Sequence, residues 1–262
     1  MIVFGAIAPH GDPAFAEGSP TRQALELLGR RLAEAEPEVT VLATPHSVHV
    51  EDSFAVVTSA KIAGSLAEQE LEFSHGVELA CAVDRELAQS VIASLRERDL
   101  PAVGMSFGSN DPALAEMPMD WGTLIPLWFL GQDERPVVVV SPCRERSLED
   151  HVLGGRALAA ATEGKRAAFV ASADHGHAHD PEGPFGFDPA SAAYDERVVE
   201  LVSANRLGDL LSLESIVEPA SADSLWQMAL LHGALGDGFR GELLSYERPT
   251  YFGMLVAAFE PA

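Results

Sequence analysis

The sequence IVFGAIAPH, residues 2–10, sets the pattern on which the fold depends. Its first seven residues carry no charge, which is typical of a strand buried on both faces, and proline and histidine end the run. The pattern returns in VTVLATPH at residues 39–46, and a third apolar run at 167–172 leads into ADHGHAH. Proline fixes its own φ and cannot donate to a strand ladder, so we expect His10 and His46 on stiff turns just past their strands.

Helix-like segments separate these apolar runs along the chain. In residues 20–35, for example, Leu25, Leu28 and Leu32 share one helical face. Such alternation predicts an α/β fold, here one domain over residues 1–262 with a mostly parallel central sheet flanked by helices. The expected strands are 2–8, 39–44, 55–58, 102–106, 137–141, 167–172 and 255–259, and the expected helices are 20–35, 83–98, 148–162, 195–205 and 225–235.

Composition narrows the function classes. The 262 residues are 47% hydrophobic and 22% charged, which is ordinary for a soluble globular enzyme. Forty acidic and 17 basic residues give a net charge of -23, which argues against nucleic acid or an anionic membrane as partner. No apolar run approaches the ~18 residues of a membrane span, and no secretory signal is visible. The two cysteines are too few for a disulfide framework, which favours a cytoplasmic location.

The placement of the nine histidines indicates a metal site. Ligands of open parallel sheets bind just beyond the carboxyl ends of the strands. If the three strands are neighbours, His10, His46 and the histidines of 175–179 meet in one pocket there. Imidazole suits Zn, Fe, Cu and Ni. Two histidines with one carboxylate leave a metal face open, as in non-haem Fe(II) oxygenases and some catalytic zinc sites.

Four motifs, in order, resemble the class III extradiol ring-cleavage dioxygenases, whose nearest type is the catalytic β-subunit of protocatechuate 4,5-dioxygenase. They are APHG at 8–11, TPHSVHVE at 44–51, MDWGTLIPL at 119–127 and ASADHGH at 171–177. The resemblance implies a non-haem Fe(II) enzyme that uses O2 to cleave the ring of a catechol-like or aminophenol-like aromatic. Zinc and manganese are the alternative metals.

The resemblance also implies roles for individual residues. His10 and His46 match the first two metal ligands of the family. The third is a glutamate before a late helix; here Asp223, one methylene shorter, stands nearest that point, and Glu218 is the reserve. The acid–base histidine of the family falls on His177.

A further motif departs from the family. Trp121 stands where the family usually carries a histidine, and a tryptophan cannot exchange a proton. We expect Trp121 to fill core, with stacking on an aromatic substrate as the alternative. Its presence leaves more proton transfer to His177, or gives His175 or His49 a share.

The remaining charged and histidine residues carry weaker expectations. Asp174 and Glu51 either orient imidazoles or cap loops. We expect His75, His151 and His179 at the surface, and His232 packed in the core; an extra zinc ligand is the alternative for His179.

The expected ligands are a small aromatic substrate and O2. The expected protein partner is a second copy of the chain or a small second subunit. The sequence is also compatible with two other functions. One is a zinc-dependent hydrolase that uses the same histidines, and the other is a non-enzymatic metal-binding member of the same superfamily.

Overall fold

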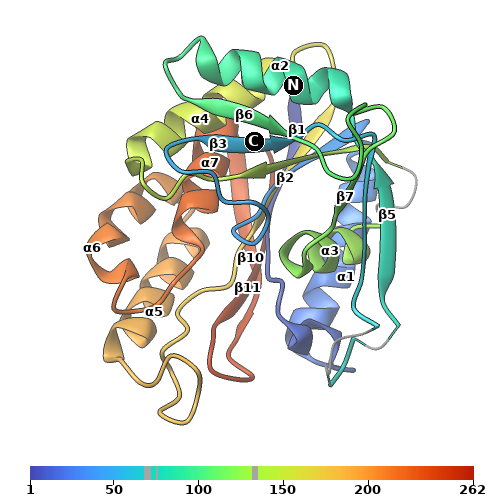
Figure 1. Cartoon of the computed structure of the whole chain (residues 1–262). Coiled ribbons are helices and arrows are strands. Elements are labelled where there is room, and N and C mark those ends of the chain that lie inside the picture. Colours follow the sequence, from blue (N-terminus) through green and yellow to red (C-terminus); the bar gives the residue numbers. More distant parts are fainter. Residues whose placement is uncertain (68–71, 75, 132–134) are drawn as a thin grey trace.

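The N-terminal apolar run forms β1 (Ile2–Ala8), a central strand of an eight-stranded sheet in the order β10-β11-β1-β9-β2-β8-β3-β6 (Figure 1). The computed structural model describes residues 1–67, 72–74, 76–131 and 135–262. The other strands of this sheet are β2 (Val39–Ala43), β3 (Phe54–Val57), β6 (Ala102–Met105), β8 (Val137–Ser141), β9 (Ala167–Ser172), β10 (Phe239–Glu247) and β11 (Met254–Pro261).

Four neighbouring strands, β1, β9, β2 and β8, run parallel, so their carboxyl ends lie at one edge of the sheet. Ala8 of β1 lies beside Ser172 of β9, and Ala43 of β2 lies beside Val140 of β8. The outer strands β11 and β10 are antiparallel, and so is β3 against β8. The predicted mostly parallel sheet is thus confirmed, and it brings the segments after three apolar strands to one place.

Alternate side chains of the sheet enter two separate cores, which makes a layered single α/β domain. One face is covered by α2 (Arg85–Arg96), α4 (Leu148–Ala161), α5 (Pro189–Ser203) and α7 (Leu225–Leu235). The other face is covered by α1 (Pro20–Glu34), α3 (Trp121–Phe129) and a small sheet of β4 (Lys61–Ser65), β5 (Glu78–Ala82) and β7 (Glu116–Pro118). Short turns complete the chain: η1 (Asp12–Phe15), η2 (Leu207–Leu213) and α6 (Glu214–Val217). No helix in the described ranges is long and apolar enough to cross a membrane.

Several elements differ from the sequence prediction. The helix expected at 195–205 begins at Pro189, because Asp188 caps it by accepting a hydrogen bond from the Ala190 amide. The small sheet and β10 were not predicted. Their strands are partly exposed on both faces, so they lack the apolar run or the strict alternation that identifies a strand.

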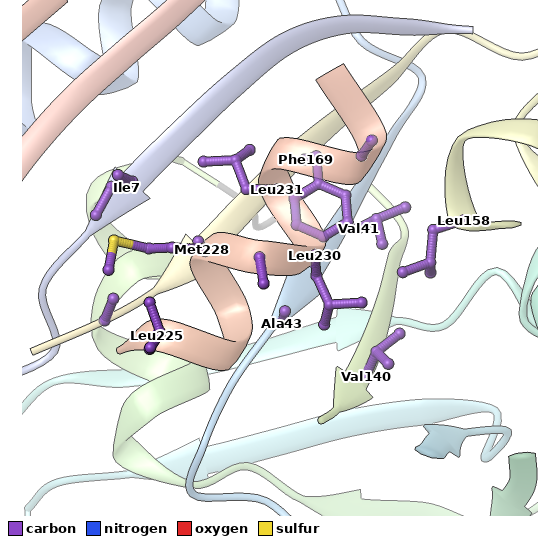
Figure 2. Packing of buried hydrophobic residues seen from close by; sticks show 14 of the residues in the cluster. Ile7, Val41, Ala43, Val140, Leu158, Phe169, Leu225, Met228, Leu230 and Leu231 are labelled. Carbon is purple, nitrogen blue, oxygen red and sulfur yellow. The ribbon is translucent and has the colours of Figure 1, made fainter. Parts of the chain in front are cut away.

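Helix α7 lies directly on the sheet, and its first residues follow Asp223. Figure 2 shows Leu225, Met228 and Leu231 packed toward strand residues such as Ile7 and Phe169. On its other side α7 contacts α4 through glycines. A methyl group on Gly155 would lie 2.0 Å from the Leu230 carbonyl oxygen, and one on Gly233 would lie 2.0 Å from that of Val152. The two helix backbones therefore touch, and α7 cannot shift toward α4.

The helix contact yields a stability prediction. Gly155→Ala forces α4 and α7 apart, and we expect it to lower the free energy of unfolding by about 3 kcal/mol, the upper range for overpacked cores. Urea denaturation followed by circular dichroism measures the effect. Gly238→Ala is the matched control, because a methyl group there meets nothing within 4 Å. Equal effects of the two substitutions would contradict the close contact.

His151, expected at the surface, is instead fully buried in α4. Its Nδ1 lies 2.8 Å from the Ser147 carbonyl oxygen, and its ring meets the edge of Phe54. Polar neighbours suggested exposure, but His151 shares a helical face with Leu148 and Leu158, which point into the core. Burial lowers the pKa of His151 to about 4, because the charged imidazole would lose its hydration.

This buried histidine makes stability depend on pH. The unfolded chain binds a proton at His151 near pH 6.5, whereas the folded chain resists protonation down to about pH 4. The contribution to stability is therefore complete above pH 6.5 and is lost as the pH falls toward 4, by about 3 kcal/mol at 1.4 kcal/mol per pH unit. His151→Gln is expected to flatten this part of the curve in urea titrations between pH 4 and 7. An unchanged slope would assign the acid sensitivity to other groups.

Candidate active site

Three potential metal ligands meet at the carboxyl edge of the parallel strands. His10 follows β1, His46 follows β2, and Asp223 precedes α7. The Nε2 atoms of the two histidines lie 3.0 Å apart. The Asp223 Oδ2 atom lies 3.4 Å from Nε2 of His46 and 3.7 Å from Nε2 of His10. These three residues form the group that, among the described histidine, cysteine and acidic side chains, could hold a metal ion.

The spacing of these three atoms suits a single ion. Two ligand atoms each about 2.1 Å from a metal, at angles between about 90° and 125°, lie about 3.0–3.7 Å apart. The second carboxylate oxygen of Asp223, Oδ1, is buried and has no hydrogen-bond partner in the described part of the chain. Two imidazoles and one carboxylate on one side leave the other side open. The donor set therefore fits an open divalent metal site.

Neighbouring groups fix the orientation of His10. The Ser172 hydroxyl donates to the Gly122 carbonyl oxygen, so Ser172 Oγ accepts from Nδ1–H of His10, at 2.9 Å. This leaves Nε2 directed at His46 and Asp223. The His10 amide in turn donates to Asp174 Oδ1, at 3.1 Å. Asp174 is buried, and its contacts hold the turn that carries His10 as well as the imidazole itself.

The local electrostatics favour a positive charge between these groups. Burial lowers the pKa of His10, but the carboxylates of Asp174 and Asp223 outweigh it and raise that pKa to about 9. Burial likewise raises the pKa of Asp223, yet hydrogen bonds with His10 and His46 bring it well below its usual value. Burial raises the pKa of Asp174. Three buried ionisable groups in contact are stable only with a cation among them, whether a proton or a metal ion.

A cavity of about 1130 Å³ opens directly from the three ligand atoms. His177 lies on its wall, with its ring stacked on Phe252 at 5.3 Å between centroids and 20° between planes. The His177 amide donates to the Ala220 carbonyl oxygen, which ties its loop to the segment before Asp223. The Nδ1 atom of His177 is buried without a partner in the described residues. His177 therefore presents an imidazole to the cavity on a firmly held backbone.

The alternating histidines after β9 do not share one environment. His175 lies beneath the cavity, fully buried, with Nδ1 3.1 Å from Ser224 Oγ, and burial lowers its pKa. His179, expected in solvent, has a buried side chain whose Nε2 lies 2.8 Å from Asp195 Oδ2. Asp195 Oδ1 accepts from the Gly176 amide, so the turn before His177 is anchored to α5. His75 lies outside the described residues, and His232 is only partly buried.

Other predicted residues occupy the rim. His49 is 58% exposed and pairs with Glu145 at 3.1 Å. Glu218 lines the cavity but lies outside the group of His10, His46 and Asp223, and Glu51 is exposed. Trp121 was expected in the core but is 44% exposed. Asp120 caps α3, so Trp121 is the first residue of the helix. Its ring is tilted over that of His46, with the ring centroids 4.5 Å apart.

The walls and supports of the site carry no signal in the local sequence pattern. Phe252 and Tyr251 precede β11, and both line the cavity. Asp195 lies far from His179 along the chain, so no local pattern connects the pair. Ser172 belongs to the ASADHGH motif at 171–177. Its position at the end of a strand beside β1 is the one feature of the sequence from which its contact with His10 could be predicted.

The comparisons with known proteins agree with this geometry. Residues 6–257 match the family described as the catalytic LigB subunit of aromatic ring-opening dioxygenase. The chain belongs to this family. A curated relative of the LigB-like chain is Protein CA_C1420 of Clostridium acetobutylicum, which is 24% identical over 232 residues. The match covers 87% of this chain and 49% of that protein, so the chain spans about half the length of the relative.

A solved structure shares the fold of this LigB family member. It is that of an uncharacterized protein, JW3007, from Escherichia coli K12, with a TM-score of 0.67 and 15% sequence identity. The likeness covers 98% of this chain and 99% of the other. At this level of identity it establishes the common fold and carries no information on substrate.

Proposed function

We propose that this LigB family member, over residues 1–262 as a single catalytic domain, is a non-haem Fe(II)-dependent extradiol dioxygenase. Its substrate is a catechol-like or aminophenol-like aromatic, whose ring it opens with O2. The observation that carries the proposal is the meeting of His10, His46 and Asp223 at the floor of a cavity in a chain of this family. In the proposal these three residues hold the metal.

When bound, Fe(II) supplies an open coordination face where an aromatic diol and O2 can meet. The chain provides the rest of the chemistry. His177 is the acid–base residue: its imidazole accepts the proton that a substrate hydroxyl loses on binding and returns it later in the reaction. The stack on Phe252 orients the ring, and the buried Nδ1 has no partner among the described residues, which leaves it available to a ligand. His175 is tied to Ser224 beneath the cavity and acts by supporting the segment before α7.

The cavity suits a planar ligand. Trp121 over His46 and Phe252 under His177 offer two aromatic surfaces for a substrate ring. The cavity volume of about 1130 Å³ slightly exceeds the roughly 300–1,000 Å³ that is usual for small-molecule sites. We therefore expect a substituted rather than a bare catechol. His49 at the rim contributes to substrate entry or proton exchange with solvent.

The proposal includes a cytoplasmic setting and a second copy or a small second subunit. The chain matches about half of a longer relative, which supports the proposal that the catalytic domain works together with a further protein segment, either fused to it or separate.

Metal analysis of protein purified without oxygen, followed by O2 uptake with a panel of catechols, tests the proposal. We expect one equivalent of iron, catechol-dependent O2 consumption and a coloured ring-opened product. Tightly bound zinc without O2 uptake would contradict the dioxygenase function and favour a zinc hydrolase or a non-enzymatic metal-binding protein.

A further inference from the structure

Three consecutive amides fix the loop that carries His177, which lies between β9 and α5. The amides of residues 176–178 donate, in that order, to Asp195 Oδ1, the Ala220 carbonyl oxygen and Ser191 Oγ, at 2.7, 2.9 and 2.9 Å. Two of the three acceptors are side chains of α5. Because these two hold the backbone on both sides of His177, they set the direction in which its side chain leaves the loop.

The buried face of α5 is polar where it meets this loop. Ser191 and Asp195 lie about one helical turn apart and are 0% and 2% exposed. Further along the helix the same face carries Val198 and Val202, which are in the core. A methyl group on Gly176 would lie 2.8 Å from the Cα atom of Ser191, so the loop rests directly on the helix. A carboxylate in such a buried place is stable only when donors surround it.

Two further side chains hold the carboxylate of Asp195. Its Oδ2 atom lies 2.8 Å from Nε2 of His179 and 2.7 Å from the hydroxyl oxygen of Tyr246, in β10. Arg248 lies 2.7 Å from Nδ1 of His179, and because a guanidinium only donates, the imidazole proton is on Nε2. Burial and the Asp195 carboxylate raise the pKa of Tyr246, so its hydroxyl keeps its proton and donates. Asp195 therefore accepts three hydrogen bonds, which fix both of its oxygens.

The same carboxylate lies against the hairpin of β10 and β11. The Gly253 amide donates to the Gly176 carbonyl oxygen at 3.1 Å. A methyl group on Gly253 would lie 2.2 Å from Asp195 Oδ2. Phe252, on which the His177 ring stacks, is the residue before Gly253. Asp195 thus lies between the backbone that carries His177 and the backbone that carries its stacking partner.

We propose that Asp195 is a positioning residue for His177 and is itself held in place by His179 and Tyr246. This inference rests on the proposed function, in which His177 transfers the proton, and it adds three residues that act only through that imidazole. Proton transfer requires the imidazole to lie within hydrogen-bond reach of the substrate hydroxyl, and a displacement of about 1 Å can cost about 100-fold in rate. Loss of the carboxylate should therefore affect turnover rather than binding.

Asp195→Asn tests the proposal, because asparagine keeps the shape but turns its NH2 group toward at least one of the three donors. With iron-loaded protein and 4-methylcatechol, we expect kcat to fall about 10- to 100-fold while KM and metal content stay near their wild-type values. In a His177→Asn background the same substitution should change turnover less than about 2-fold, because the imidazole through which Asp195 acts is missing. Equal losses in both backgrounds would assign Asp195 to general stability and overturn the proposal.

Two further measurements use metal-free protein and need no turnover. Hydrogen exchange followed by mass spectrometry should show residues 176–178 exchanging about 10- to 100-fold faster in the Asp195→Asn protein, the range for a lost hydrogen bond to a charged group. In the histidine NMR spectrum, the Cε1–H resonance of His177 is identified by its absence from the His177→Asn protein. It should shift in the Asp195→Asn protein as the ring moves relative to Phe252. Unchanged exchange and an unchanged resonance would refute the positioning role.

Asp84→Asn is the matched control. The Asp84 carboxylate likewise accepts from a backbone amide, that of Leu87, and from a side chain, that of Lys165, but it does not line the cavity. This substitution removes the same charge and should leave kcat, the exchange of residues 176–178 and the His177 resonance unchanged. Effects equal to those of Asp195→Asn would show that any buried carboxylate has this influence, against the proposal.

A pair of substitutions at His179 tests the support of Asp195. His179→Gln should retain most of the turnover, because the glutamine amide can donate to Asp195 as Nε2–H does. His179→Leu removes that donor and should behave like Asp195→Asn. Equal turnover in the two His179 variants would exclude this residue from the network.

The outcomes separate this inference from the proposed function. Faster exchange and a shifted His177 resonance in the Asp195→Asn protein, with no O2 uptake by the wild type on any catechol, would support the positioning role and refute the dioxygenase. Catechol-dependent O2 uptake that is equal in the wild-type and Asp195→Asn proteins would do the reverse.

Discussion

Alanine in place of His46 is expected to reduce bound iron from about one equivalent to a trace and to lower ring cleavage by about 10³-fold or more. The reason is that the remaining pair, His10 and Asp223, no longer encloses an ion. Even the residues that only hydrogen-bond to metal ligands typically cost about 10–100-fold in metal affinity or activity when they are mutated. Metal analysis and O2 uptake measure the two effects. His10→Ala and Asp223→Ala should behave alike.

Two variants serve as controls for the metal prediction. His232→Ala removes a histidine that lines a separate hollow with Gly208 and should retain the metal. Glu218→Ala should also retain it, which separates Asp223 from the alternative carboxylate. Full metal content in the His10, His46 and Asp223 variants, with normal thermal unfolding, would show that these residues are not the ligands.

His177→Asn gives the second large effect. We expect kcat to fall 10²- to 10⁴-fold, the range for loss of a general acid–base group, while metal content and the dissociation constant of the catechol stay near their wild-type values. The ring stacks on Phe252 and takes no part in the group formed by His10, His46 and Asp223, so its loss leaves those donor atoms in place.

Added imidazole provides a sharper readout for this variant. Free imidazole can enter the space left by the side chain and restore part of the turnover if the missing function is proton transfer. A His177 variant that loses its metal would instead make this residue a ligand. Unchanged turnover would remove it from the chemistry altogether.

The strand ends carried most of the information in the sequence. A proline ends each of the strands β1 and β2, and this is a local signal in the sequence. Because both strands pair in parallel with β9, the histidines that follow them, His10 and His46, lie at the same edge of the sheet. Asp223 was placed by resemblance and by its position before a strongly apolar helix. Its approach to the histidines depends on how α7 packs on the sheet and α4, which no local pattern encodes.

Side-chain directions in loops were harder to predict. His175 and His179 alternate with His177 in the sequence, yet Ser224 and Asp195 draw them into separate contacts. Both partners lie on other elements, so spacing within the loop could not identify them. Trp121 was misplaced for a similar reason, because its exposure depends on the helix cap at Asp120 rather than on its apolar neighbours.

The origin of the three donor atoms in the chain has a consequence for biosynthesis. His10 and His46 leave the ribosome early, whereas Asp223 follows only after most of the chain has been made. With these residues as the metal centre, an unfinished chain has two imidazoles and no closing carboxylate. On that assumption an ion would be captured only after Asp223 has been synthesised, and metal occupancy would report that the chain extends at least to α7.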